Sequence, residues 1–68
     1  MNKNILTKRE KEVFDLLITN NSTANIAKKL KISEKTVRNH ISNAMQKLGV
    51  KGRAGAVVEL LKLGEISI

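Results

Sequence analysis

The chain has 68 residues, no cysteine, one histidine and a formal net charge of +7 at pH 7. A chain this short forms one domain, so we expect residues 1–68 to be a single folded unit. The lack of cysteine excludes disulfides and thiolate metal sites, and a single histidine leaves little for a metal site or a catalytic triad. We therefore expect no metal, no cofactor and no enzymatic activity.

The positive charge is concentrated in the middle of the chain. Residues 28–53 contain eight lysines and arginines but one acid, Glu34. Such a stretch favours a polyanionic partner, with nucleic acid first and an acidic lipid surface second, although an ordinary solvated face is the simpler alternative. No apolar run reaches the roughly 18 residues of a membrane span, and no signal peptide opens the chain. We expect a soluble cytoplasmic protein with no membrane partner.

Turn signals divide a proline-free, all-helical pattern into four segments. The first helix is predicted to begin after Thr7, which forms a capping box with Glu10, while Leu6 is placed to staple the helix start. The second helix is predicted over residues 23–30, with Ser22 or Thr23 as its N-cap. Both helix starts are thus predicted from local capping residues, which need no tertiary contact to act.

A sharp corner follows the second helix. Only about two residues separate it from the next N-cap, Ser33, and so short a link is typical of a helix-turn-helix rather than an antiparallel hairpin. Lys31 lies in this corner, where many such turns have glycine, so a positive φ there would be mildly unfavourable. The third helix is predicted from Ser33 to Leu48 and stops at Gly49.

The third helix has two chemically different faces. At about 100° per residue its apolar residues form one stripe, which we assign to the core: Val37, Ile41, Ala44, Met45 and Leu48. The opposite side gathers polar residues: Lys35, Asn39, Ser42 and Gln46, flanked by Arg38 and His40, with Asn43 between. A solvated helix face usually mixes Glu with Lys, but Glu34 is the only acid here. Donors and amides of this kind read base edges and bind phosphates, so we predict that this face enters a major groove.

The fourth helix, predicted over about residues 54–63 and closed by Gly64, carries more apolar surface than a terminal helix needs. One face consists of Ala54, Val57 and Leu61, with Val58 at its margin, and a second consists of Ala56, Leu60 and Leu63. The excess predicts a partner surface, and we assign the second face to a symmetric dimer interface. In the alternative, the tail residues Ile66 and Ile68 fold back over that face.

Four motifs together resemble a known family over about residues 6–64. They are LTxRE, IAxxLxIS, KTVxxH and KLxVKxR followed by AV, which this chain carries as LTKRE, IAKKLKIS, KTVRNH and KLGVKGR. The chain resembles the LuxR/FixJ-type DNA-binding domain, and most of all a stand-alone member that acts late in spore formation. The resemblance implies an all-α four-helix bundle with a helix-turn-helix, the LuxR-type tetrahelical DNA-binding domain, which binds double-stranded DNA through its third helix and dimerises through its last.

The resemblance also implies roles for individual residues. Positions that match the family's base readers are Glu34, Lys35, Arg38, Asn39 and Ser42. Positions that match phosphate contacts are Thr23, Thr36, His40, Asn43, Lys47 and Lys51. Most lone histidines are bystanders, but His40 lies beside the basic face and could donate to a phosphate, so both interpretations stay open.

We therefore expect a homodimeric, sequence-specific transcription regulator that binds a pseudo-palindromic site on the nucleoid and controls sporulation genes, with RNA polymerase as a candidate partner. The start MNKN favours a complete chain; the alternative is an output domain excised from a two-component response regulator. A sigma-factor fragment is disfavoured by the loop VKGR and the apolar fourth helix. A protein-interaction or RNA-binding module is also disfavoured, because Phe14, the only aromatic residue, provides no stacking platform.

Overall fold

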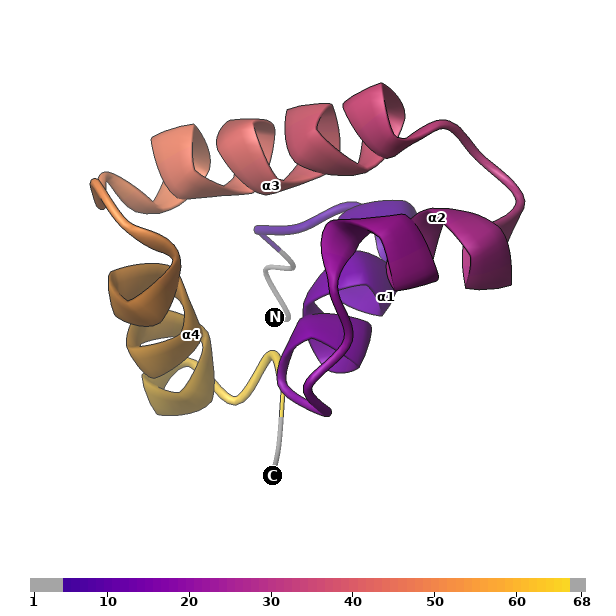
Figure 1. The fold of residues 1–68 in the computed structure, drawn as a ribbon. Coiled ribbons are helices and arrows are strands. Elements are labelled where there is room, and N and C mark those ends of the chain that lie inside the picture. Colours follow the sequence, from indigo (N-terminus) through magenta and orange to yellow (C-terminus); the bar gives the residue numbers. More distant parts are fainter. Residues whose placement is uncertain (1–4, 67–68) are drawn as a thin grey trace.

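The computed structural model describes residues 5–66, which fold into four α-helices and no strand (Figure 1). The helices are α1 (Lys8–Leu17), α2 (Thr23–Leu30), α3 (Glu34–Leu48) and α4 (Arg53–Lys62). This arrangement confirms the expected all-α fold, although α4 begins one residue earlier than predicted. In the described part of the chain, no helix is long and apolar enough to cross a membrane.

Local side-chain caps set the starts of the first three helices. Thr7 Oγ1 accepts the N–H of Glu10 at 3.1 Å, and Glu10 Oε1 accepts the N–H of Thr7 at 3.0 Å, which confirms the capping box. Ser22 caps α2 and Ser33 caps α3, each by accepting a backbone N–H three residues on. Gly52 precedes α4 without a side-chain cap, so the start of α4 depends on packing.

The corner between α2 and α3 is built on a left-handed residue. Lys31 has φ 59° and ψ 45°, so this non-glycine residue takes the left-handed conformation that side chains disfavour. The N–H of Ile32 then donates to the carbonyl of Ala27 at 3.0 Å and closes the end of α2. This tight closure turns the chain directly into α3.

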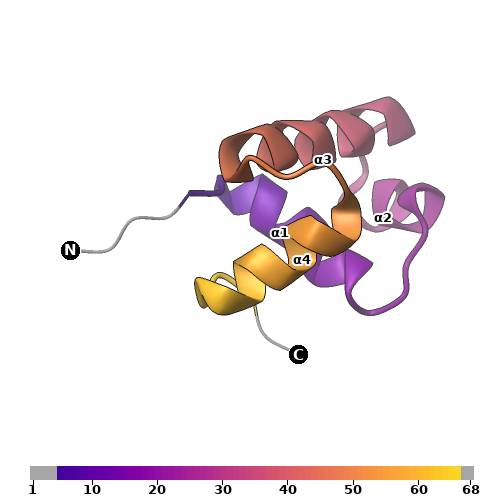
Figure 2. The same ribbon diagram turned by 90° about the vertical axis from the view of Figure 1, so that its left-hand side faces the viewer.

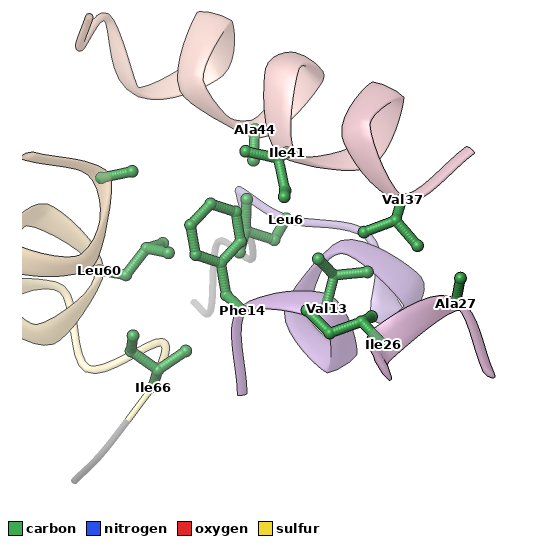
Figure 3. Close-up of a cluster of buried hydrophobic side chains, with 11 residues drawn as sticks. Leu6, Val13, Phe14, Ile26, Ala27, Val37, Ile41, Ala44, Leu60 and Ile66 are labelled. Atoms are coloured by element: carbon green, nitrogen blue, oxygen red, sulfur yellow. The ribbon is translucent and has the colours of Figure 1, made fainter. Parts of the chain in front are cut away.

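The core lies beneath α3, which packs against each of the other three helices. Figures 1 and 2 show α3 lying across one side of the molecule, with α1 and α4 below it. In Figure 3, Val37, Ile41 and Ala44 point from α3 toward Phe14 and the other buried side chains. These three residues are buried as predicted, whereas Met45 and Leu48 are half-buried at the edge of the stripe. Three neighbouring helices therefore fix the rotation of α3 about its own axis.

The structure reverses the predicted roles of the two faces of α4. Ala56 and Leu60 are fully buried in the core (Figure 3 labels Leu60), so the prediction that they lie in a dimer interface is wrong. Leu63, the third residue of that set, is 50% exposed because it lies beyond the end of the helix. Both faces are apolar and lie on the same short helix, so hydrophobic patterning alone could not decide which one turns inward.

The other apolar face of α4 turns outward. Val58 is 51% exposed, Ala54 is exposed, and Val57 and Leu61 are half-buried. Ile66 is buried in the same cluster as Ala56 and Leu60, which agrees with the alternative that the tail folds back over the inward face. Ile68 lies outside the described residues. The tail thus helps to select which face of α4 enters the core.

Candidate nucleic-acid interface

Most of the side chains predicted to contact DNA lie on α3, whereas Thr23 begins α2 and Lys51 follows α3. All five predicted base readers are exposed: Glu34, Lys35, Arg38, Asn39 and Ser42. Among the predicted phosphate contacts, Asn43, Lys47 and Lys51 are exposed, whereas Thr23, Thr36 and His40 are half-buried. Lys35, Asn39 and Ser42 therefore lie opposite the buried stripe of α3, and the remaining predicted contacts lie at its flanks, on α2 or just after α3.

Several of these side chains have no side-chain hydrogen bond or ion pair within residues 5–66: Lys35, Asn39, Ser42, Asn43 and Lys51. Their donors and acceptors face solvent and are available to a ligand. The described residues include no group of histidine and acidic side chains that could hold a metal ion. The free groups suit an extended polar surface such as a DNA groove.

The N-terminal end of α3 contains a network that the sequence reasoning missed. Thr23 Oγ1 donates to Glu34 Oε2 at 2.7 Å, and Arg38 Nη1 lies 3.5 Å from the same oxygen. The network joins the first residue of α2 to the first turn of α3. The Glu34–Arg38 pair could have been expected from its i,i+4 spacing, but the Thr23 contact depends on the corner between the helices.

Thr36, another predicted phosphate contact, also has a partner within the protein. Its hydroxyl pairs with the hydroxyl of Ser33 at 2.8 Å, and its N–H donates to Ser33 Oγ at 3.0 Å. The side chain of Thr36 therefore belongs to the N-cap of α3. Because the donor between the two hydroxyls can exchange, Thr36 can still offer a proton to a phosphate.

The C-terminal end of α3 is tied to the start of α1 by an ion pair. Lys47 Nζ lies 2.7 Å from Glu10 Oε1, the same oxygen that accepts the N–H of Thr7. Glu10 is only 4% exposed, whereas the side chain of Lys47 is 37% exposed. Lys47, which was predicted to contact a phosphate, thus has a structural partner. No local sequence pattern could reveal this pair, because its residues are 37 positions apart.

The Glu10 carboxyl is ionised in this setting. Burial alone would raise its pKa, but hydrogen bonds from Lys47 and from the backbone of Thr7, with the electrostatic influence of Lys47 and His40, outweigh burial. The pKa of Glu10 therefore lies below its ordinary value of 4.5. The ammonium of Lys47 has three donors, so it can hold Glu10 and still offer a donor to a phosphate.

Comparisons with known proteins agree with this geometry. A family model described as "Bacterial regulatory proteins, luxR family" matches residues 4–60. The chain is 68% identical over 66 residues to Spore germination protein GerE of Bacillus subtilis (strain 168), which covers 97% of this chain and 89% of that protein. It is 48% identical over 64 residues to Transcriptional regulatory protein DegU of Brevibacillus brevis, covering 94% of this chain but 27% of that protein.

A solved structure shows the same likeness in three dimensions. A structure of the transcription factor GerE superposes on this chain with a TM-score of 0.93 at 62% sequence identity. The match covers 96% of this chain and 97% of that chain. Sequence and fold therefore indicate the same relatives.

Proposed function

The chain belongs to the luxR family of bacterial regulatory proteins and is a DNA-binding transcription regulator, and we propose that it binds specific double-stranded sites as a homodimer with α3 in the major groove. The observation that carries this proposal is the exposed polar face of α3, held in place by a buried stripe on the same helix. A fixed helix with free donors and acceptors can present the same pattern to every site that it meets.

The face divides into two roles according to position. Arg38, Asn39 and Ser42 lie in the middle of α3 and read bases, because Arg pairs well with guanine and Asn with adenine in the major groove. Side chains nearer the margins hold phosphates and so set the orientation of the helix on DNA. They are Thr36, His40, Asn43, Lys47 and Lys51.

Arg38→Ala tests this assignment. Duplexes bound by the wild-type chain are first selected from a random library, and affinities are then measured for a selected duplex and for a shuffled duplex of the same composition. We expect Arg38→Ala to lose about 1–3 kcal/mol on the selected duplex and little on the shuffled one. Lys28→Ala, on the exposed side of α2, is the control and should keep the preference. Equal losses of Arg38→Ala on both duplexes would contradict base reading.

The outward face of α4 supports a homodimer. This apolar stripe consists of Ala54, Val57, Val58 and Leu61. Exposed apolar surface of this kind favours a symmetric partner, and two copies would match a pseudo-palindromic site. Leu63 lies just beyond the stripe and can extend the contact.

Sedimentation tests the dimer with Val58→Glu, because Val58 is half exposed and outside the core. We expect the wild type to be dimeric and Val58→Glu to be a folded monomer with weaker binding to the selected site. Lys62→Glu, on an exposed position of the same helix, should remain dimeric. If the wild type is monomeric at a protein concentration on the order of tens of micromolar, dimerisation in the absence of DNA is contradicted.

We also propose that the regulated genes serve spore formation, since the relative that is 68% identical is named a spore germination protein. Immunoprecipitation from sporulating cells should recover promoters of spore genes, and their absence would contradict this role. The alternative, an output domain of a response regulator, is supported by the match to DegU and predicts a much heavier native chain on an immunoblot. A cytoplasmic, nucleoid-bound location and a contact with RNA polymerase remain predictions.

A further inference from the structure

We propose that Thr23 and Glu34 do not contact DNA themselves but position Arg38 and thereby set its base discrimination. The inference rests on the DNA-reading role of α3 proposed above. It replaces the expectation that Thr23 holds a phosphate and that Glu34 reads a base. The three side chains meet at one carboxylate oxygen, Glu34 Oε2, at the corner of the helix-turn-helix.

The hydroxyl of Thr23 is already committed. A threonine hydroxyl has one proton to donate, and Thr23 donates it to Glu34 at 2.7 Å. A phosphate oxygen accepts hydrogen bonds but cannot donate one, so the hydroxyl would have to abandon Glu34 to bind DNA. The bond to the Glu34 carboxylate is already charge-assisted, so a phosphate, which is also a charged acceptor, would offer Thr23 no stronger bond in exchange.

The carboxylate of Glu34 is poorly suited to lie against DNA on its own. It is the only acid within residues 28–53, and phosphates would repel it. Two positive influences hold it at the start of α3: the partial positive charge of the helix N-terminus and the guanidinium of Arg38. Thr23 fixes its orientation from α2, because the β-branched side chain of threonine has few rotamers. Glu34 therefore presents a defined oxygen to Arg38.

Arg38 keeps donors free for a base. Its contact with Glu34 is at Nη1, and a guanidinium has five N–H donors in a rigid plane. An exposed i,i+4 pair stabilises its geometry by only about twofold, whereas a bidentate Arg–guanine contact discriminates by about 5- to 150-fold. Arg38 can thus contact a base through its remaining donors while Glu34 stays at Nη1. The Glu34–Arg38 pair limits the number of conformations of the Arg38 side chain, which is 57% exposed. Arg38 therefore loses less conformational entropy when it binds DNA.

The test uses Thr23→Val, which removes the hydroxyl and keeps the shape of the side chain. Affinities are measured by fluorescence anisotropy on a duplex selected by the wild-type chain and on its shuffled counterpart. We expect the ratio of the two affinities to fall by about twofold, which is the size of the stabilisation that the Glu34–Arg38 pair can transmit. Thr23→Ser, which keeps the hydroxyl but loses the branched side chain, should restore part of the ratio, and circular dichroism checks that each variant is folded.

A second variant changes the charge and keeps the acceptor. Glu34→Gln should lower the same ratio while it raises affinity for the shuffled duplex, because one negative charge near the phosphates is removed. A residue with a purely structural role would weaken both affinities together. These opposite shifts keep the test informative even if Thr23→Val is poorly folded.

The combination of Thr23→Val with Arg38→Ala decides between positioning and direct contact. If Thr23 acts through Arg38, Thr23→Val has no further effect on the ratio once Arg38 is alanine. The proposal is overturned if the loss persists in that background, if Thr23→Val leaves the ratio unchanged, or if it weakens binding to both duplexes equally, as the loss of a phosphate contact would. Failure of the DNA-reading role itself is separate, since the wild type would then show no preference between the duplexes.

Discussion

The two ends of α3 each carry an acid–base pair, but in opposite surroundings. At the N-terminal end, Arg38 and Glu34 lie 3.5 Å apart with side chains 57% and 44% exposed. At the C-terminal end, Lys47 and Glu10 lie 2.7 Å apart, and the Glu10 side chain is only 5% exposed. The first pair joins residues of one helix, whereas the second joins α3 to α1. The same chemistry therefore serves two purposes on one helix.

Burial decides which purpose each pair serves. Exposed pairs contribute about 0.3–0.5 kcal/mol and are screened by salt, so the N-terminal pair biases the conformation of Arg38 but adds little to stability. A buried carboxylate that loses its partner is far more costly, because it keeps its charge without water. The C-terminal pair therefore anchors the helix, whereas the N-terminal pair orients a side chain that is proposed to read bases. The comparison predicts three effects of decreasing size.

The largest effect is expected from Lys47→Met, which keeps the aliphatic stem and removes the ammonium. The Glu10 carboxylate would then remain buried with the N–H of Thr7 as its one remaining hydrogen-bond donor among the described residues. We expect the free energy of unfolding to fall by about 1–3 kcal/mol, measured by urea denaturation at pH 7. Lys51→Met is the control: Lys51 is exposed, and its loss should change stability by no more than about 0.5 kcal/mol. Similar losses of stability in Lys47→Met and Lys51→Met would show that the Lys47–Glu10 pair does not anchor α3.

A smaller effect is expected from acid. The lowered pKa of Glu10 means that the folded state binds this proton less readily than the unfolded state. The stabilisation is therefore present above the ordinary value of 4.5 and is lost as pH falls from there through the lower folded pKa. Each unit of difference in pKa contributes about 1.4 kcal/mol.

Glu10→Gln provides the measurement, because it keeps an acceptor for the N–H of Thr7 and cannot titrate. Urea denaturation between about pH 6 and pH 3 should show a shallower loss of stability in this variant than in the wild type. Glu12→Gln, on the exposed side of α1 in a pair with Arg9, is the matched control. If Glu10→Gln and Glu12→Gln show the same pH dependence of stability, the buried carboxylate of Glu10 contributes no more to that dependence than a surface carboxylate.

Local signals explain why most of the fold could be predicted from the sequence. The caps at Thr7 and Ser33 act on backbone groups within three residues, and Gly49 ends α3 with a φ of 70°. The core stripe of α3 follows from helical period alone. The polar side of α3 could be identified for the same reason, since whatever faces away from the core must face solvent or a ligand.

The features that were missed depend on contacts distant in the chain. Thr23 meets Glu34 across 11 positions, and Lys47 meets Glu10 across 37. Neither pairing has a periodic signature, because each depends on how two helices meet in space. The inward face of α4 was misassigned for a related reason: Ile66, beyond the end of the helix, belongs to the cluster that buries Leu60. Patterning within α4 contains no information about that contact.

The smallest effect is expected at the exposed end and concerns stability rather than binding. Arg38→Ala should change the free energy of unfolding by no more than about 0.5 kcal/mol, because solvent screens its pair with Glu34. Raising NaCl from about 0.1 to 1 M shortens the screening length from about 10 to 3 Å, so even this difference should vanish. The loss caused by Lys47→Met should persist in the same salt, since Glu10 is shielded from solvent ions. A salt-resistant loss in Arg38→Ala would instead mean that the N-terminal pair helps to hold α3 on α2, and that reading and anchoring are not separated along this helix.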